Sequence, residues 1–218
     1  MAAKGWQERA AVFDARAAEY DQWYEGSPLF ALERDALKGL ATPLVGPALE
    51  IGVGPGRFAE ALGVRFGLDP AWSPLVLARR RGVLPGQGVG EHLPYRSGIF
   101  GTVYLLFTLC FVTDPAAVLA ECHRVIRPGG HLVLGLVPVA SPWGKALAAK
   151  KAADHPFYRH ARFYEVGEAE ALLLGAGFAV VERRSALFQP PDAKLGAEPA
   201  REGALEGAGF VVMVGRRR

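Results

Sequence analysis

Asparagine is absent from this chain of 218 residues, which also holds only two cysteines and five histidines. Cys110 and Cys122 lie on different predicted elements and lack metal-ligand spacing, so we expect both to be reduced, packed thiols. The histidines form no H-E-x-x-H or similar set. The sequence therefore predicts a function that uses no metal.

Long hydrophobic runs and a strong charge of one sign are also missing. No stretch reaches the roughly 18 uninterrupted apolar residues that a membrane-spanning helix needs, and residues 1–8 contain no apolar segment typical of a signal peptide. The net charge of +3 and the short arginine runs at 79–81 and 216–218 are typical of a solvated surface. We therefore expect a cytoplasmic protein without a membrane partner, and we do not expect nucleic acid as its partner.

The chain is rich in apolar residues (50%) and in glycine (27), a composition that suits one α/β domain. Its most informative stretch is 47–63, where an apolar strand containing Glu50 is followed by Gly52, Gly54 and Gly56 and then by a helical pattern. Glycine adopts backbone angles that a Cβ forbids, and it lets a ligand lie against the main chain. Strand, glycine turn and helix together open a nucleotide-binding βαβ unit.

The spacing of these glycines bears on the ligand. A dinucleotide-binding turn follows G-x-G-x-x-G, whereas here the third glycine comes one residue early. Glu50 stands two residues before the first glycine, and a carboxylate at the end of a buried strand is unstable without a partner. A cationic ligand group, held directly or through water, would supply that partner.

The pattern E-x-G-x-G-x-G resembles motif I of the class I S-adenosylmethionine-dependent methyltransferases. The resemblance implies that the turn cradles the methionine and ribose part of S-adenosylmethionine, whose ammonium and sulfonium groups suit the acid. The alternative is an ordinary strand-to-helix turn in a glycine-rich chain.

A second acid, Asp69, ends the next short strand, predicted at 64–70. A carboxylate at this place can accept hydrogen bonds from both ribose hydroxyls, in dinucleotide and S-adenosylmethionine folds alike. The sequence G-L-D-P at 67–70 also resembles the second motif of the methyltransferase family. The alternative is that Asp69 only caps the next helix, although Ser73-Pro74 is the better helix start.

The segment G-V-G-E-H-L-P-Y at 88–95 resembles the family's G-x-A-E-x-L-P-F, whose backbone lies along the adenine. The resemblance implies that adenine recognition rests on main-chain groups near Gly90, Glu91 and His92. Val89 stands where some family members have an adenine-binding aspartate.

The apolar run 100–112 predicts a central parallel strand that is covered on both faces. Two residues in it depart from the family pattern. Gly101 replaces an aspartate, and Cys110-Phe111 replaces a histidine pair, which removes a candidate base. We therefore assign no catalytic residue.

The sequence E-C-H-R-V-I-R-P-G-G-H-L-V-L at 121–134 closely resembles the family segment L-x-E-x-x-R-V-L-K-P-G-G. Asp114-Pro115 predicts the start of the helix before it, and 131–137 is the strand after it. The strands predicted at 178–188 and 210–214 are joined without a helix, which implies an antiparallel final hairpin. The family's sheet ends in this way, and a plain dinucleotide fold does not.

Together these elements predict an α/β fold with a Rossmann-like, doubly wound sheet of seven strands. The sheet is mostly parallel with an antiparallel last strand, and N-terminal helices and a small lid complete it. We expect a single domain over 1–218, divided into a helical cap (1–40), a cofactor-binding half (41–137), a candidate substrate lid (138–165) and a C-terminal helix and hairpin (166–218). The lid segment mixes aromatic and basic residues without a clean period, so an irregular packing insertion is the alternative.

The helical stretch 10–23 contains Tyr20 within A-x-x-Y-D, which resembles the N-terminal helix of small-molecule methyltransferases of the ubiquinone/menaquinone type (methyltransferase type 11). In those proteins the tyrosine closes over the cofactor; simple packing onto the sheet is the alternative. The full set of cofactor contacts implied by the resemblance is Tyr20, Glu50, Gly52, Gly54, Gly56, Arg57, Asp69, Pro70, Gly90, Glu91, His92 and Phe107. The candidate substrate contacts are aromatic or basic, namely Tyr24, Trp143, Tyr158 and His160.

The sequence therefore predicts an S-adenosylmethionine-dependent methyltransferase that acts on an unidentified small-molecule acceptor and releases S-adenosylhomocysteine. Sulfonium is a good leaving group, so positioning and desolvation can supply most of the acceleration. One alternative is an NAD(P)-dependent Rossmann oxidoreductase, which Asp69 allows but the glycine spacing and the final hairpin oppose. A non-catalytic S-adenosylmethionine-binding protein is another. An RNA acceptor stays open without a visible RNA-binding module, and the sequence leaves monomer or homodimer open.

Overall fold

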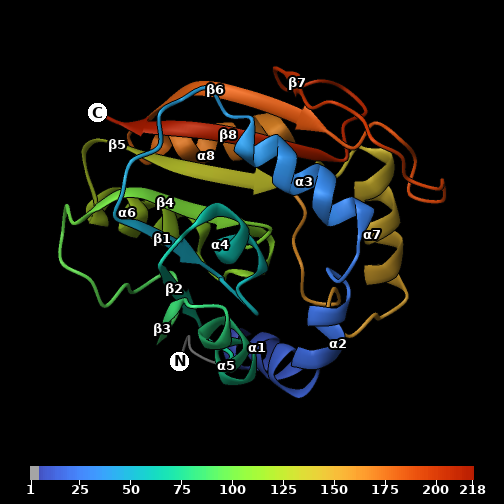
Figure 1. The fold of residues 1–218 in the computed structure, drawn as a ribbon, viewed down its shortest axis with the longest axis horizontal. Coiled ribbons are helices and arrows are strands. Elements are labelled where there is room, and N and C mark those ends of the chain that lie inside the picture. Colours follow the sequence, from blue (N-terminus) through green and yellow to red (C-terminus); the bar gives the residue numbers. More distant parts are fainter. Residues whose placement is uncertain (1–4) are drawn as a thin grey trace.

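The computed structural model describes residues 5–218. Residues 1–4, with which the predicted helical cap and the N-terminal segment 1–8 both begin, lie outside the described part. One mixed sheet crosses the molecule in the strand order β3-β2-β1-β4-β5-β8-β6-β7 (Figure 1). Its strands are β1 (Ala48–Ile51), β2 (Phe66–Asp69), β3 (Leu84–Gln87), β4 (Phe100–Leu106), β5 (Ile126–Leu136), β6 (Phe178–Ala186), β7 (Arg201–Glu202) and β8 (Phe210–Arg217).

Nine helical segments flank this sheet within residues 5–218. They are α1 (Gly5–Ala15), α2 (Ala17–Gln22), α3 (Pro28–Lys38), α4 (Arg57–Leu62), α5 (Trp72–Arg80), the 3-10 turn η1 (Leu109–Phe111), α6 (Pro115–Val125), α7 (Pro142–Ala152) and α8 (Val166–Gly175). Among residues 5–218, no helix has the length and apolar character needed to cross a bilayer.

The sheet confirms the doubly wound α/β prediction, but it has eight strands rather than seven. The pairs β3-β2, β2-β1, β1-β4 and β4-β5 are parallel, and β8 runs antiparallel between β5 and β6. The additional strand, β7, is antiparallel to β6 at the edge of the sheet. It has only two residues, both charged and exposed, so no apolar pattern could reveal it.

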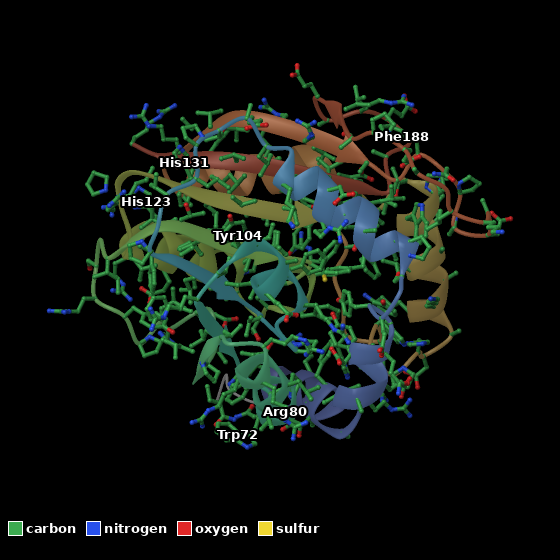
Figure 2. The ribbon with its side chains drawn as sticks, in the orientation of Figure 1. Trp72, Arg80, Tyr104, His123, His131 and Phe188 are labelled. Atoms are coloured by element: carbon green, nitrogen blue, oxygen red, sulfur yellow. The ribbon has the colours of Figure 1, made fainter. Side chains whose placement is uncertain are left out.

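Alternate residues along the central strands feed two separate hydrophobic layers, as strand geometry requires. On β4, Val103 and Leu105 face a layer that includes α6 and α8. Tyr104 and Leu106 face the other layer, which includes α3, α4 and α5. Figure 2 shows Tyr104 inside the molecule and Trp72 at its periphery, in line with exposed fractions of 7% and 56%.

Three boundaries differ from those predicted. The strand predicted at 100–112 ends at Leu106, because Phe107 adopts a left-handed backbone (φ 53°) and turns the chain toward η1. The helical region predicted at 5–40 is three helices, interrupted at Arg16 and again at 23–27. Ser73 is not the N-cap of α5, which begins at Trp72; instead the Ser73 N–H donates to Asp14 of α1 (2.6 Å).

The segment 138–165 contains one regular element, α7, that its composition did not predict. Ser141 caps this helix by accepting a hydrogen bond from the Gly144 N–H (3.0 Å), and Pro142 occupies its first turn. Gly144 is its one buried residue, so the helix has no apolar stripe. In Figure 1, α7 lies beyond the carboxyl end of β5, beside α3.

Candidate active site

The parallel strands end on one side of the sheet, where an open α/β fold binds its ligands. The turn after β1 contains Gly52, Gly54 and Gly56, all with positive φ (71°, 49° and 80°). A Cβ on Gly52 would lie 2.2 Å from Oγ1 of Thr108, and one on Gly56 would lie 2.9 Å from the Ala78 backbone. These two glycines therefore permit close packing within the protein.

Gly54 differs from its two neighbours because a Cβ there would meet only the Tyr20 ring, at 3.6 Å. Its open side faces a cavity that Gly52, Asp69 and Glu91 also line. Among the three glycines, Gly54 is thus the one that leaves room for a ligand against the main chain.

Asp69 joins the ends of β1 and β2 across this turn. Its Oδ2 accepts from the Gly54 N–H (2.9 Å), and its Oδ1 accepts from the Ala71 N–H (2.8 Å). Burial raises the pKa of Asp69 to about 6, although these two hydrogen bonds oppose the shift. Asp69 therefore orders the turn, and each of its oxygens keeps a lone pair for a ligand hydroxyl.

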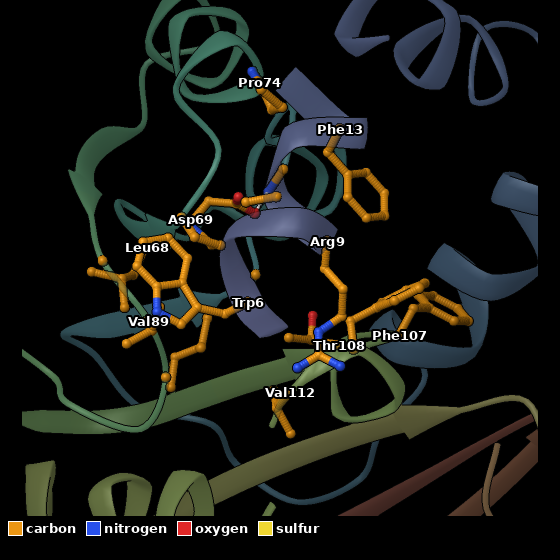
Figure 3. Close-up of a pocket in the computed structure, with 18 of the residues that line it drawn as sticks. Trp6, Arg9, Phe13, Leu68, Asp69, Pro74, Val89, Phe107, Thr108 and Val112 are labelled. Carbon is orange, nitrogen blue, oxygen red and sulfur yellow. Dashed lines mark hydrogen bonds between the residues drawn. The ribbon is translucent and has the colours of Figure 1, made fainter. Parts of the chain in front are cut away.

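Helix α1 covers the cavity, which we call the turn cavity. In Figure 3, Trp6 of α1 lies beside Leu68 and Val89, whereas Arg9 of the same helix extends toward Thr108. Arg9 is held across the cavity by a hydrogen bond to Oγ1 of Thr113 (2.5 Å). The opposite walls come from segments after β2, β3 and β4, including Pro70, Gly90 and Glu91 of the predicted set.

Glu50 lies beneath the same turn and is only 2% exposed. Its Oε2 has no hydrogen-bond partner within residues 5–218. Burial raises the pKa of Glu50 well above its ordinary value, and the nearby charge of Asp69 raises it further. A small space lined by Tyr20, Gly54 and Arg57 adjoins the carboxyl. A cationic group placed there would pair with the Glu50 carboxyl and give its Oε2 a hydrogen-bond donor.

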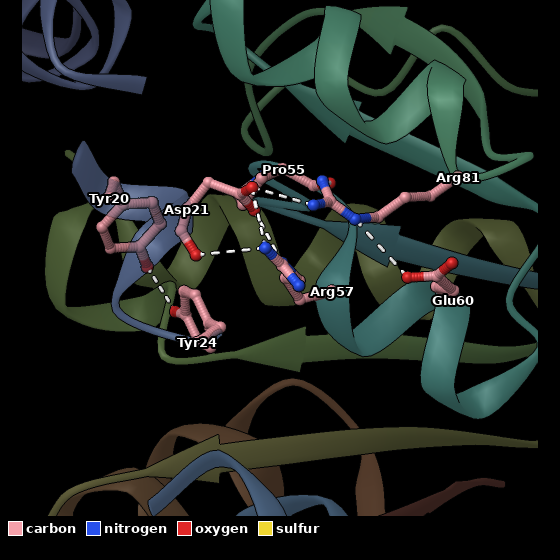
Figure 4. A network of polar contacts seen from close by, with 7 residues as sticks. All are labelled: Tyr20, Asp21, Tyr24, Pro55, Arg57, Glu60 and Arg81. Carbon is pink, nitrogen blue, oxygen red and sulfur yellow. Dashed lines mark hydrogen bonds and ion pairs between the residues drawn. The ribbon is translucent and has the colours of Figure 1, made fainter. Parts of the chain in front are cut away.

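Arg57, another predicted contact, is engaged by the protein itself. Its Nε donates to Asp21 of α2 (2.7 Å), and Arg81 donates both to Asp21 (2.8 Å) and to the Pro55 carbonyl (2.7 Å) (Figure 4). Burial alone would raise the pKa of Asp21, but the hydrogen bonds and charges of the two arginines lower it overall. The cluster of Asp21, Arg57 and Arg81, which we call the arginine clamp, fastens α2 to the glycine turn.

The clamp fixes the position of Tyr20, the residue before Asp21. The Tyr20 hydroxyl lies 2.8 Å from that of Tyr24, and burial raises the pKa of both phenols. Tyr20, Phe13, Phe107 and Phe111 line both the turn cavity and a second, larger cavity. These four rings therefore form the junction between the two spaces.

The second cavity has a volume of about 590 Å³ and mainly aromatic walls. We call it the aromatic cavity. It contains Tyr24, Trp143 and Tyr158 of the predicted substrate contacts, whereas His160 is exposed and does not line it. Trp143 is held by donating from Nε1 to the Gln189 carbonyl (2.8 Å).

Besides Glu50, which lines only the small space, three residues of the predicted cofactor set do not line the turn cavity. Gly56 is the N-cap of α4, Arg57 borders only the small space beside Glu50, and His92 does not line any of these cavities. The His92 N–H donates to the Val89 carbonyl (3.2 Å) and so closes the turn that carries Gly90.

Several lining residues were not predicted, among them Trp6, Arg9, Thr108 and Glu33. Of these four residues, only Glu33 could have been identified from the sequence pattern. It is a charged residue on the face of α3 that also carries the buried Leu32, Ala36 and Leu37.

Cys110 and Tyr20, which lie at or beside the junction, have raised pKa values and are protonated at neutral pH. Cys110, which stands in place of a family histidine, donates its thiol to the Phe107 carbonyl (3.2 Å), and burial raises its pKa to about 12. Tyr20 has a raised pKa as well. At neutral pH neither group is suited to act as a general base. Within 5–218 there is no group of three or more potential metal ligands; the absence of a metal from the reaction stays a prediction.

Comparison with known proteins gives concordant matches. The model of the methyltransferase domain family matches residues 49–134. An uncharacterized protein of Mycobacterium tuberculosis is 50% identical over 201 residues, which are 90% of this chain and 70% of that protein. An uncharacterized protein of Methanocaldococcus jannaschii is 32% identical over 93% of this chain and 97% of its own.

A crystal structure from Thermotoga maritima superposes with a TM-score of 0.88 at 34% identity, covering 96% of this chain and all (100%) of that one. That protein is described as an S-adenosylmethionine-dependent methyltransferase and a possible histamine N-methyltransferase.

Proposed function

Since the chain belongs to the class I S-adenosylmethionine-dependent methyltransferases, we propose that its cofactor binds in the turn cavity and its methyl acceptor in the aromatic cavity. The chain is an enzyme of this family, and S-adenosylmethionine is the methyl donor that the family uses. The single observation that carries the placement is the combination of Gly54, open toward the cavity, with the buried Glu50, whose Oε2 has no partner within residues 5–218.

The residues fit the cofactor group by group. Glu50 would receive the ammonium of the methionine part, directly or through water, and Asp69 would accept the ribose hydroxyls with its remaining lone pairs. Main-chain groups near Gly90 and Glu91 would lie along the adenine. Pro70 would line the ribose side, and Phe107 would close the cavity toward the acceptor.

The other predicted residues act as supports in this proposal. Gly56 packs α4 against α5, and the His92 backbone shapes the adenine loop. Arg57 acts through Asp21 to hold Tyr20 over Gly54. In this proposal Tyr20 would close over the cofactor, rather than only pack its helix onto the sheet.

When bound, S-adenosylmethionine supplies an electrophilic methyl group on a sulfonium leaving group. The chain's own contribution is to position the acceptor and to exclude water. Tyr20, Phe107 and Phe111 line the junction through which the acceptor must approach, and their rings desolvate it. Because Cys110 and Tyr20 keep their protons, we assign no general base, and the acceptor presents its own lone pair. S-adenosylhomocysteine is the expected product.

A small-molecule acceptor is supported by the size of the aromatic cavity, about 590 Å³. The Thermotoga maritima protein is associated with histamine, also a small molecule, although that substrate is attributed to that protein alone. A cytoplasmic location is supported by Cys110 and Cys122, which are free thiols and fit a reducing compartment.

Calorimetric titration with S-adenosylhomocysteine, with NADH as the control ligand, tests the cofactor placement. We expect the wild type to bind S-adenosylhomocysteine and not NADH. Gly54→Val fills the open side of the turn and Asp69→Ala removes the ribose partner, so both should weaken binding about tenfold or more. Gly196→Ala, in a distant exposed loop, is the matched control and should bind normally. Binding of NADH alone, or full affinity in Gly54→Val, would contradict the placement.

A further inference from the structure

Glu33 is the one acidic residue among those that line the aromatic cavity. It projects from α3 and is 6% exposed. No hydrogen bond or ion pair to its carboxyl occurs within the described residues 5–218. Burial raises its pKa to about 8. The cavity therefore contains a buried acid without a partner from the protein.

Partly buried acids elsewhere in residues 5–218 do have such partners. Glu182 accepts from the Thr42 N–H and hydroxyl (2.8 and 2.6 Å), and Glu121 is paired with Arg124 (2.6 Å). Glu50, whose Oε2 also has no partner within residues 5–218, lines only the small space beside the glycine turn and not the aromatic cavity. Since burying a carboxyl without a partner is unfavourable, Glu33 is best explained by a ligand that supplies one.

The groups around Glu33 are mainly aromatic. Tyr24 and Tyr158 line the same cavity as Glu33. Burial raises the pKa of both phenols, and the charge of Glu33 adds to each shift. Cys110 also lies near Tyr158 and keeps its proton. Lys150 lies 5.9 Å from the centroid of the Tyr158 ring, but it is an exposed residue at the cavity's edge and makes no ion pair with Glu33.

We propose that Glu33 binds a protonated amine, or an equivalent cationic nitrogen group, on the methyl acceptor, while aromatic walls pack the rest of the molecule. Aromatic faces attract a desolvated cation, and the carboxylate completes its hydrogen bonds. The acceptor class is therefore a small molecule that carries a basic nitrogen. This inference rests on the proposed function, because it assigns the acceptor to the aromatic cavity.

Binding of such a cation should release a proton, and this release can be measured. Near neutral pH the empty cavity holds Glu33 in its protonated form. When an ammonium ligand binds, the carboxyl ionises and one proton passes to the solvent. No covalent bond changes in this step.

The test uses the full chain saturated with S-adenosylhomocysteine and three probes that share a phenyl ring: 2-phenylethylamine, 2-phenylethanol and phenylacetate. We expect the amine to bind about tenfold or more tightly than the alcohol and the carboxylate least of all. Glu33→Gln should abolish that preference, and Asp35→Asn, an exposed site on the same helix, should keep it. The amine's affinity should rise from about pH 6.5 to about pH 9 in the wild type, as Glu33 ionises, and stay flat in Glu33→Gln.

The outcomes separate this inference from the proposed function. A protein that fails to bind S-adenosylhomocysteine contradicts the cofactor placement. A protein that binds it but prefers phenylacetate, binds none of the probes at about millimolar concentration, or keeps its amine preference in Glu33→Gln overturns the role of Glu33 alone. Unfolding curves of Glu33→Gln check that the variant is folded.

Discussion

The arginine clamp makes a quantitative prediction for the substitution Asp21→Asn. Asp21 accepts two hydrogen bonds from the Arg57 side chain (2.7 and 2.9 Å) and one from Arg81 (2.8 Å), and its side chain is only 15% exposed. Asparagine keeps one acceptor oxygen and has no charge. The substitution therefore leaves Arg57 without its ion-pair partner and leaves Arg81 with only its longer pair to Glu60 (3.4 Å).

The magnitude follows from the number and burial of these contacts. A hydrogen bond to a charged group contributes about 1.5–3 kcal/mol, and breaking a buried pair on one side costs about 3–5 kcal/mol. Since the clamp is partly solvated and asparagine keeps one bond, we expect a loss of about 2–3 kcal/mol in the free energy of unfolding. For a chain of this size that corresponds to a decrease of roughly 4–12 °C in Tm.

Thermal and chemical unfolding at pH 7 measure this loss, with Asp35→Asn as the matched control. Asp35 pairs with Arg34 at 2.7 Å but is 61% exposed, so its loss should be within about 0.5 kcal/mol. The pKa of Asp21 is lowered in the folded state, so its contribution is present above the ordinary value of 3.8 and disappears as the pH falls through the folded-state pKa. An Asp21→Asn variant as stable as Asp35→Asn at pH 7 would refute the role of the clamp.

Two further predictions concern Gly52 and Glu33. Gly52→Ala combines a φ of 71° with a Cβ 2.2 Å from Oγ1 of Thr108, so it should lower the free energy of unfolding by about 2–4 kcal/mol. Gly63→Ala, with a φ of 68° but open space around its Cβ, should lower it by about 1 kcal/mol. Equal losses in denaturant unfolding would contradict the clash. Burial raises the pKa of Glu33 from 4.5 to about 8. Between these two pH values only the folded state keeps the proton, so the free energy of unfolding falls as the pH rises, by up to about 1.4 kcal/mol per pH unit. The Glu33→Gln variant should show a shallower decline in unfolding free energy over this range, and an unchanged slope would count against the buried acid.

Much of the fold could be predicted because its signals are local. The apolar run of β4 and the Asp114-Pro115 start of α6 need only neighbouring residues, and Asp114 does cap α6 by accepting from the Ala117 N–H (3.0 Å). Strand β7 depends on pairing with β6 across a long loop, which no local pattern encodes. Helix α7 was missed because it has a capping signal but no buried stripe.

The same distinction applies to the site. Glu50 and the glycines of the turn are close in sequence, so their spacing, together with Asp69 and the later motifs, predicted a nucleoside site. The arginine clamp joins residues that are 36 and 60 positions apart, so it required the folded chain. Glu33 gave a local signal, a charge on an apolar helix face, but only the fold places it in the same cavity as Tyr158.

The central claim, that Glu50 receives the cationic amino group of the cofactor, is tested most directly by a pair of ligands. S-adenosylhomocysteine carries this amino group, and 5′-methylthioadenosine has the same nucleoside without it. We predict that Glu50→Gln lowers the affinity for S-adenosylhomocysteine about tenfold or more. The affinity for 5′-methylthioadenosine should change by no more than about twofold. Unchanged affinity for S-adenosylhomocysteine, or an equal loss for both ligands in a folded variant, would contradict the account.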